Sequence, residues 1–276
     1  MTAAAARPRT VAGPPRLGPI LHFVEHRLLL YRRAWRGSAI SSFLTPILFL
    51  ASMGLGLGGI VDGGGGGADG ALGVPYLVFL APGLLAGTAM QTAAGECTFP
   101  VMSGFLWSKN FLAAHASPLR PIEIAIGYFA WVAFRLLLVC GIYTAIIVAF
   151  GAAASPLVVL AIPAAVLTGL AFATPITAYA ATQRETQGFN ALFRFGITPL
   201  FIFSGTFFPI EGLPAVLQPI AWLTPLFHGV SLSRSLALGT ALDEPVATIA
   251  HVGYLVALAL IGAWWAARTF ERRLER

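Results

Sequence analysis

The sequence predicts an all-α membrane protein with six transmembrane helices. Of its 276 residues, 57% are hydrophobic and only 10% are charged, and the mean hydropathy is +0.81. Soluble domains carry charge on about a quarter of their residues. In addition, six stretches hold the roughly 20 apolar residues that a helix needs to cross a hydrocarbon core about 30 Å thick. A soluble fold is therefore excluded.

The six predicted spans cover residues 38–60, 74–94, 122–150, 156–181, 191–208 and 246–267. An even number of spans places both ends of the chain on one side of the membrane. The segments on that side hold 15 of the 17 lysines and arginines, whereas the opposite loops hold only Arg234. Because basic residues stay on the cytoplasmic side, both termini are predicted to be cytoplasmic.

The net charge of +6 does not indicate a nucleic-acid-binding protein. Seven basic residues precede Ser38 and four follow Ala267, so they flank apolar segments instead of lining a groove. We therefore expect no nucleic-acid partner.

The N-terminal region divides into a tail and an amphipathic helix. Residues 1–16 are mostly Ala, Pro and Arg, a composition that favours a disordered cytoplasmic tail. In residues 17–36, apolar side chains repeat at helical spacing and basic ones fall largely on the other side. This pattern predicts a helix lying along the inner leaflet. The alternative is an ordinary basic flank that follows the charge rule without forming a separate element.

Prolines break the apolar stretch that follows the fifth span. Pro209, Pro214, Pro219 and Pro225 recur every five or six residues, and each removes a backbone donor and disfavours helix just before it. Non-helical backbone at membrane depth is tolerated only where protein or a water-lined cavity surrounds it. We expect short re-entrant helices between the fifth and sixth spans, beside a transport path or a gate.

Two glycine-rich stretches lie near the end of the first span. Residues 62–70 predict a flexible external linker. Gly54, Gly56 and Gly59 match a dinucleotide-binding pattern by letter, but that site requires a preceding strand. We expect these glycines to allow close helix packing instead.

The cytoplasmic segment from Glu96 to Arg120 is too apolar for a solvated loop. Pro100 and Gly104 interrupt it and argue against a further span. An exposed apolar patch of this kind marks a contact surface. The candidates for contact with a cytoplasmic partner are Phe99, Met102, Phe105, Leu106, Trp107 and Lys109. Packing of the same residues within the chain is the alternative.

Two charged residues belong to the third span. Glu123 follows Pro121 in a first helical turn, where a carboxylate complements the helix dipole. Arg135 lies about 18 Å further along a helix axis and cannot pair with Glu123. A buried arginine usually faces a bundle interior or a cavity. It either lines a path or joins helices, or it extends its guanidinium to the membrane surface.

Several catalytic motifs are absent from the sequence. A phosphate-binding loop needs a lysine after glycine, but the only lysine, Lys109, lies between Ser108 and Asn110. The spans also lack the acidic and histidine series of a proton relay. We therefore expect no ATPase activity, no catalytic residue and no cofactor or metal in this chain.

The late proline-rich segment resembles the membrane subunits of type-2 ABC exporters. The matching residues are Ser204-Gly205-Thr206-Phe207-Phe208-Pro209, Leu213-Pro214, Pro219-Ile220, Leu223-Thr224-Pro225-Leu226 and Arg234. The stretch Glu96-Cys97-Thr98-Phe99-Pro100-Val101-Met102 is similar to the branch of lipo-oligosaccharide (nodulation-factor) export permeases, with drug-export permeases as near relatives.

This resemblance implies a transmembrane domain over residues 17–276 in the bacterial inner membrane. It implies pairing with a second, identical or similar permease subunit and with two cytoplasmic ATPase subunits, which bind ATP and Mg. Residues 17–36 would be the connecting helix. A coupling helix that contacts the ATPase would lie between Glu96 and about Ala113, and residues 209–232 would form extracellular re-entrant helices.

The implied function is ATP-driven export of an amphipathic, lipid-linked or drug-like substrate along a path between the second and fifth spans. Candidates for the path or its gate are Arg135, Phe201, Phe207, Phe208 and Pro209. Aromatic residues of the fifth span face either cargo or lipid. An ion-coupled carrier is the alternative, with Glu123 as its only acidic candidate. A membrane-embedded transferase would need clustered polar residues, which the sequence does not show.

Overall fold

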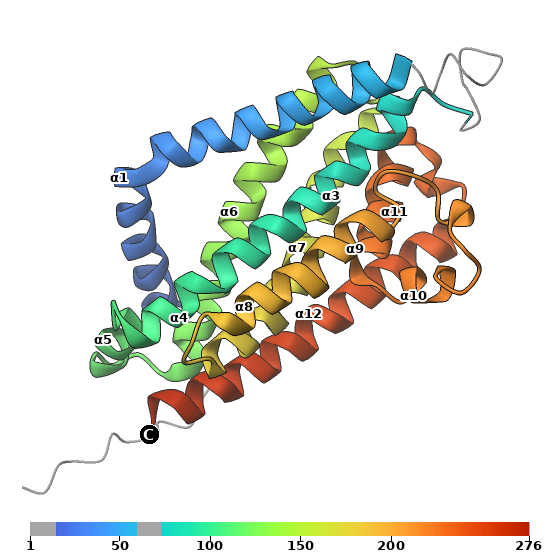
Figure 1. Ribbon diagram of the computed structural model, residues 1–276. Helices are drawn as coiled ribbons and strands as arrows, with labels where there is room; N and C mark the ends of the chain where they lie inside the picture. Colours follow the sequence, from blue (N-terminus) through green and yellow to red (C-terminus); the bar gives the residue numbers. More distant parts are fainter. Residues whose placement is uncertain (1–14, 60–72, 276) are drawn as a thin grey trace, which may run out of the picture.

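The computed structural model describes residues 15–59 and 73–275, and the regular elements in these ranges are all helices (Figure 1). The long ones are α1 (Leu17–Phe49), continued by the π-helical η1 (Leu50–Leu57), α3 (Tyr76–Cys97), α6 (Pro121–Ala149), α7 (Ala161–Thr182), preceded by η3 (Pro156–Leu160), and α12 (Pro245–Leu274). Most of the predicted tail, and the glycine-rich linker 62–70, lie outside the described residues.

Short helices connect and flank the long ones. They are α4 (Phe99–Leu106), α5 (Asn110–Ala116), α8 (Gln187–Ala191), η4 (Leu192–Ile197), α9 (Thr198–Phe203), η5 (Ile210–Gly212), α10 (Gln218–Trp222), α11 (Pro225–Leu238) and η6 (Thr240–Leu242).

Helix α7 lies at the centre of the bundle and packs against α3, α6, α11 and α12. Its buried positions are largely small residues, among them Ala161, Ala165 and Gly169. Small side chains let neighbouring backbones approach closely, which is how helices associate in lipid. The sequence of α7 therefore suits a helix that packs against α3, α6, α11 and α12.

Four helical segments of the described chain are long and apolar enough to cross a membrane: Tyr76–Leu106, Pro121–Ala149, Pro156–Thr182 and Pro245–Leu274. They coincide with the predicted second, third, fourth and sixth spans. The first of them includes α3 and α4, and the last extends past the predicted end into a polar turn. The chain is a multi-pass membrane protein.

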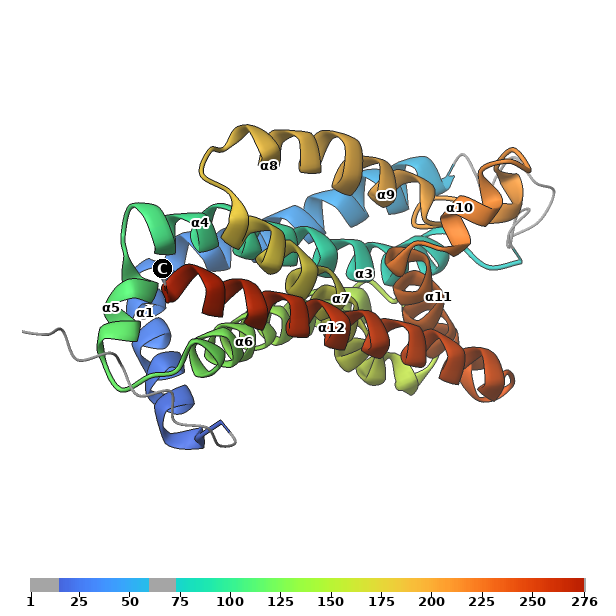
Figure 2. The ribbon, with the colours of Figure 1, turned by 90° about the horizontal axis from the view of Figure 1, so that it is seen from below.

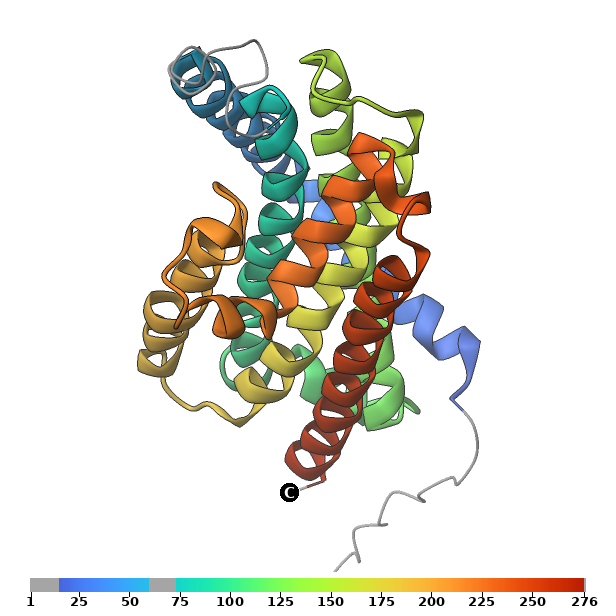
Figure 3. The same cartoon turned by 90° about the vertical axis from the view of Figure 1, so that its right-hand side faces the viewer.

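The N-terminal helix differs from the prediction of two separate elements. Helix α1 runs without interruption through the predicted boundary at residue 37, although its first turns bend away from the remainder (Figures 1 and 3). A lone Gly37 costs a helix only about 1 kcal/mol, which is too little to end it.

The three glycines near the other end of this helix differ in their packing. A Cβ atom on Gly54 would lie 2.2 Å from Leu77 Cδ1, whereas a Cβ atom on Gly56 or Gly59 would meet nothing within 4 Å. Among these three glycines, only Gly54 lies in close contact with another residue of the described ranges.

Contacts with α6 fix the beginning of α1. Ile20 and Phe23 are buried, while Leu17 and Leu21 remain exposed. Arg16 donates from its backbone N–H and its Nε to Glu123 Oε1, at 3.0 and 3.2 Å. Arg16, which the prediction placed in the tail, is therefore held against the start of α6. The exposed leucines leave an apolar surface beside basic side chains, as an interfacial helix requires.

The helix in the region of the fifth predicted span is shorter and begins earlier than expected. Helical structure runs from Gln187 to Phe203 rather than over residues 191–208. The helix ends because Ser204 leaves the helical conformation and Gly205 takes a φ of 80°, which only glycine adopts readily. Phe207 and Phe208, which the prediction placed in the span, therefore lie in the loop after it.

The proline-rich segment forms a small structure of its own followed by a packed helix. Ile210, Leu213 and Ala221 make a separate small core. Helix α11 then buries Leu226, Val230 and other residues against α3, α7 and α12. The prolines at the starts of α10 and α11 occupy first-turn positions, where a missing N–H costs nothing.

Candidate functional site

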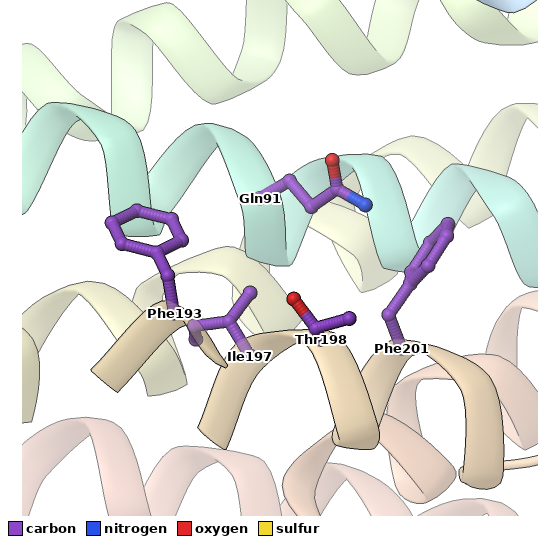
Figure 4. A pocket seen from close by; sticks show the side chains of 5 residues that line it. All are labelled: Gln91, Phe193, Ile197, Thr198 and Phe201. Atoms are coloured by element: carbon purple, nitrogen blue, oxygen red, sulfur yellow. The ribbon is translucent and has the colours of Figure 1, made fainter. Parts of the chain in front are cut away.

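A groove separates α3 from the helix that consists of α8, η4 and α9. It holds a cavity of about 210 Å³ lined by Gln91 of α3 and by Phe193, Ile197, Thr198 and Phe201 of the facing helix (Figure 4). The lining combines apolar side chains with one amide and one hydroxyl. A mixed lining of this kind suits the apolar body of an amphipathic molecule and a few of its polar atoms.

Close contact at the Phe201 end of the groove depends on Gly87. A Cβ atom at this position would lie 2.4 Å from Cε2 of Phe201, inside any allowed contact distance. Gly87 is one helical turn before Gln91, so the two residues occupy the same face of α3. The absence of a side chain at residue 87 lets the Phe201 ring pack against the backbone and end the groove.

An aromatic cluster lies beyond Phe201. The ring of Phe207 packs edge-on against Phe201 at 5.2 Å between centroids, and it lies tilted against Phe49 of α1 at 6.0 Å. The hydroxyl of Tyr76 donates to the carbonyl oxygen of Phe207 at 3.2 Å. This cluster joins α1, α3 and the loop after α9. Of the predicted path residues, Phe201 and Phe207 are therefore in contact.

The other predicted path residues lie elsewhere. Phe208 packs on the small core of Ile210, Leu213 and Ala221, and Pro209 lines a second cavity beside Arg234. Arg135 does not line the groove, because it points from α6 toward α1 and the end of α3. The prediction grouped residues that the fold separates into three places.

The helix from Gln187 to Phe203 lies at the edge of the bundle (Figures 2 and 3). Phe195 is 76% exposed, and Ile202 and Phe203 are also exposed. Its middle section, η4, is π-helical, a geometry that is frequent at functional sites. The groove therefore has one wall in the packed core and one wall on a helix with an uncovered outer face.

Arg135 forms an ion pair that joins two helices. Joining helices is one of the roles predicted for this residue. Its Nε donates to Oε1 of Glu96 at 3.1 Å, and its guanidinium lies 4.5 Å from the ring centre of Tyr31. The hydroxyl of Tyr128 donates to the backbone oxygen of Glu96. Helix α6 thus binds the last turn of α3 at two points, and α1 covers the pair.

The end of α3 leads directly into the predicted partner-contact segment. Thr98, with φ −95° and ψ −94°, separates α3 from α4. Met102 and Phe105 are buried in the core, so they offer no surface to a partner, which corrects our expectation for these two. Phe99, Trp107 and Lys109 are exposed, and Leu106 is half-buried. Packing within the chain therefore accounts for Met102 and Phe105, and contact with a partner stays a prediction for Phe99, Trp107 and Lys109.

The turn between α4 and α5 carries the most unusual backbone of the segment. Lys109 adopts a φ of 51° and is the only non-glycine residue with positive φ in the described ranges. Beside it, Trp107 is 64% exposed. A lysine gains nothing from the left-handed conformation, which costs roughly 1–2 kcal/mol. Strained positions of this kind persist mainly at functional sites.

A chain of ring contacts runs from this segment to the groove helix. Phe99 of α4 packs edge-on against Phe189 of α8 at 5.0 Å, and Phe189 also contacts Tyr179 of α7. These contacts join α4 to the beginning of the helix that carries Phe193, Ile197 and Phe201.

Sequence reasoning missed four residues of this arrangement. Gln91 and Gly87 lie in a predicted span, Glu96 lies in the last turn of α3 and Phe189 lies in α8. An amide within an apolar span was a usable signal for Gln91, since polar side chains at that depth are usually functional. Nothing in the order of residues indicates that Gly87 and Phe201, or Phe99 and Phe189, are in contact.

Glu123, the acidic candidate for a carrier, is engaged at a helix start. Its carboxylate accepts hydrogen bonds from the backbone N–H of Arg120 and from Arg16. Across residues 15–59 and 73–275, no group of three or more His, Cys, Asp or Glu side chains could hold a metal ion.

Comparison with known proteins supplies the family. Residues 20–238 match the model of the ABC-2 type transporter family. The chain is 31% identical over 249 residues to Nodulation protein J of Sinorhizobium fredii (strain NBRC 101917 / NGR234), covering 87% of this chain and 90% of the relative. It is 32% identical to Nodulation protein J of Rhizobium leguminosarum bv. trifolii, with 88% and 90% covered. The predicted resemblance is confirmed: the chain belongs to the ABC-2 type transporter family of membrane permeases.

Proposed function

We propose that this chain is the membrane-spanning permease subunit of an ATP-driven exporter that moves an amphipathic, lipid-linked or drug-like substrate out of the cytoplasm or the inner leaflet. The observation that carries the proposal is the groove between α3 and the α8–α9 helix, because its apolar lining contains one amide, Gln91, and one hydroxyl, Thr198. An amphipathic cargo needs both kinds of contact.

The proposed topology has six spans, with both termini in the cytoplasm of a bacterial cell. The helix of α1 and η1 would supply the first span, and the helix from Gln187 to Phe203 the fifth. Both the C-terminal end of α12 and the α4–α5 turn lie at one end of the bundle (Figure 1). The basic residues of these segments support the assignment of that end to the cytoplasm.

The proposed energy source is a pair of separate ATPase subunits that bind ATP and Mg. The sequence has no phosphate-binding loop of its own. The exposed Trp107 and the strained, charged Lys109 project from the α4–α5 turn and offer a contact for such a subunit. Tryptophan is enriched at protein interfaces, and a charge at the rim of an interface increases the rate of association.

The proposed assembly contains a second permease subunit, identical or similar. The outer face of the α8–α9 helix exposes Phe195, Ile202 and Phe203. A second copy facing this helix would cover the apolar face and close the open side of the groove. The transport path would then lie between the two subunits.

In the proposed mechanism, ATP binding closes the two ATPase subunits and moves the α4–α5 turn. The Phe99–Phe189 contact passes this movement to the groove helix, while the Arg135–Glu96 pair holds the end of α3 against α6. The two walls of the groove would move relative to each other. The Phe201–Phe207 contact would then open and release the cargo outward.

Reconstitution in proteoliposomes tests the proposal. The chain is inserted with and without its ATPase subunits, and movement of a fluorescent amphipathic dye is followed with and without ATP. We expect transport only when both proteins and ATP are present, and a loss of transport in Gln91→Leu. Transport driven by an ion gradient with the chain alone would favour the carrier instead.

A further inference from the structure

A second cavity, of about 230 Å³, lies apart from the groove at the opposite end of the bundle from the α4–α5 turn. Its lining includes the polar residues Ser204, Glu211, Ser231 and Arg234, with the rings of Phe79 and Phe227 beside them. Two charged side chains of opposite sign and two hydroxyls within one small cavity suit a polar headgroup rather than an apolar body.

Arg234 gives this cavity a fixed positive charge. Its Nε donates to the carbonyl oxygen of Phe79 at 3.1 Å and its Nη2 to that of Gly205 at 2.8 Å. The guanidinium lies 3.7 Å from the centre of the Phe79 ring. Burial lowers the pKa of Arg234 to about 10, and the Glu211 carboxylate opposes this effect. The side chain therefore stays charged at neutral pH. Because a guanidinium has five N–H groups, donors remain for a ligand.

Glu211 supplies a negative charge to the same cavity. It is exposed on the short helix η5 and lies close enough to Arg234 to stabilise its charge. Within the described residues, its carboxylate accepts no hydrogen bond. A purely anionic ligand would meet repulsion from this carboxylate, and a purely cationic ligand would meet repulsion from Arg234.

The surroundings of the cavity indicate the depth at which it lies. The adjoining segment exposes Val216, Ile220, Trp222 and Leu223, with exposed fractions from 49% to 80%. An exposed apolar surface that includes tryptophan is typical of the boundary between hydrocarbon and headgroups. The polar cavity next to this surface would then open to the headgroup layer.

We propose that this cavity binds the zwitterionic headgroup of a phospholipid of the outer leaflet. The phosphate would accept charge-assisted hydrogen bonds from Arg234, and the ammonium group would donate to Glu211. The hydroxyls of Ser204 and Ser231 offer further polar contacts. A phosphoethanolamine headgroup presents both charges with donors on its nitrogen. The proposal goes beyond the transport function, because a bound lipid would hold the loop after α9 and α11 together.

Binding of defined short-chain lipids to the purified full-length chain in detergent tests the proposal, by native mass spectrometry and thermal shift. We expect short-chain phosphatidylethanolamine to bind more tightly than phosphatidylglycerol of the same chain length. Glu211→Gln should weaken phosphatidylethanolamine binding about fivefold, the value of one ion contact in a partly exposed site, and should leave phosphatidylglycerol binding unchanged or stronger.

Glu244→Gln is the matched control, since Glu244 is also exposed but does not line the cavity. It should leave both affinities unchanged. Ser231→Ala should weaken binding of phosphatidylethanolamine without lowering the unfolding temperature of the lipid-free protein. Equal affinities for the two lipids in the unaltered protein, or an unchanged preference in Glu211→Gln, would overturn the proposal. Neither lipid binding nor the unfolding temperature depends on transport. Failure of this proposal would therefore leave the proposed transport function unaffected.

Discussion

The Nε of Arg135 lies 3.1 Å from Oε1 of Glu96, joining the middle of α6 to the last turn of α3. The Arg135 side chain is 10% exposed and that of Glu96 is 24% exposed. Only Thr98 separates this turn from α4. Because the pair is largely withdrawn from water, it fixes the position from which the α4–α5 segment starts.

Arg135→Met should destabilise the protein. Removal of one partner leaves an uncompensated charge, which costs 3–5 kcal/mol in a fully buried pair. Since Glu96 keeps some access to water, we expect about 3 kcal/mol or less, or a drop of several degrees in the unfolding temperature in detergent. The double variant Arg135→Met, Glu96→Gln should recover part of this loss. An unfolding temperature equal to that of the unaltered protein would show that the pair contributes nothing.

Gly87→Ala should disturb the groove. The new Cβ atom would collide with the Phe201 ring, and overpacking costs typically 1–3 kcal/mol. Gly95→Ala is a matched control on the same helix, because its Cβ atom meets nothing within 4 Å. There we expect a gain of up to about 1 kcal/mol from helix propensity. Thermal unfolding and dye transport are the measurements.

A second substitution separates the contact from a general effect of Gly87→Ala. Phe201→Leu combined with Gly87→Ala should restore part of the stability, because the smaller side chain leaves room for the methyl group. If Gly87→Ala lowers the stability by the same amount in the Phe201→Leu protein as in the unaltered protein, the assigned contact between residue 87 and the Phe201 ring is contradicted.

Lys109→Gly should separate folding from partner contact. Glycine adopts the positive φ of this position without strain, so stability should stay equal or rise by about 1 kcal/mol. Removal of the charge should weaken binding of the ATPase subunit or its stimulation. Trp107→Ala should act in the same way with little change in stability, since exposed substitutions usually stay within about 0.5 kcal/mol. Full ATPase stimulation in both variants would place the contact elsewhere.

Acidification should loosen the junction of α11 and α12. The Nδ1 atoms of His228 and His251 lie 2.8 Å apart, so one ring must donate and the other accept. Burial, and then the neighbouring His251, lower the pKa of His228, while a hydrogen bond with the Trp222 backbone opposes this. The folded state therefore binds a proton less readily than the unfolded chain, whose histidine pKa is about 6.5. Stability should be full above that pH and fall below it.

The measurement compares unfolding temperatures at about pH 7.5 and pH 5. The decrease on acidification should be smaller in His251→Leu than in the unaltered protein. His22→Gln, on the exposed surface of α1, should leave the decrease unchanged. An equal decrease in all three proteins would remove the histidine pair from the explanation.

The sequence allowed prediction of the helical class and the positions of four long apolar helices, because bilayer thickness sets their length. It also supported the cap at Glu123, which depends on neighbours in the chain. The predicted end of the fifth span, at residue 208, was wrong. The helix ends at Phe203 because Gly205 adopts a positive φ. The sequence left the burial of Met102 and Phe105 open, since an apolar side chain suits a core and an interface equally.

Contacts between distant residues account for the remaining differences. Glu96 and Arg135 form an ion pair although they are 39 residues apart in the sequence. A buried arginine requires an acceptor, but the sequence does not indicate which residue supplies it. Gly87 and Phe201 meet only because α3 and α9 are neighbours in the fold. The local pattern of residues predicts where each helix lies in the chain. Which helix faces come into contact depends on the packing of the whole bundle.

Purification of the tagged full-length chain from its native membrane, with quantification of the proteins that remain bound, tests the central claim most directly. We predict a nucleotide-binding subunit in equal amount to the permease, and an ATPase activity of the complex that falls in Trp107→Ala. A chain that purifies without such a subunit and alone drives uphill transport of the dye in proteoliposomes would contradict the account.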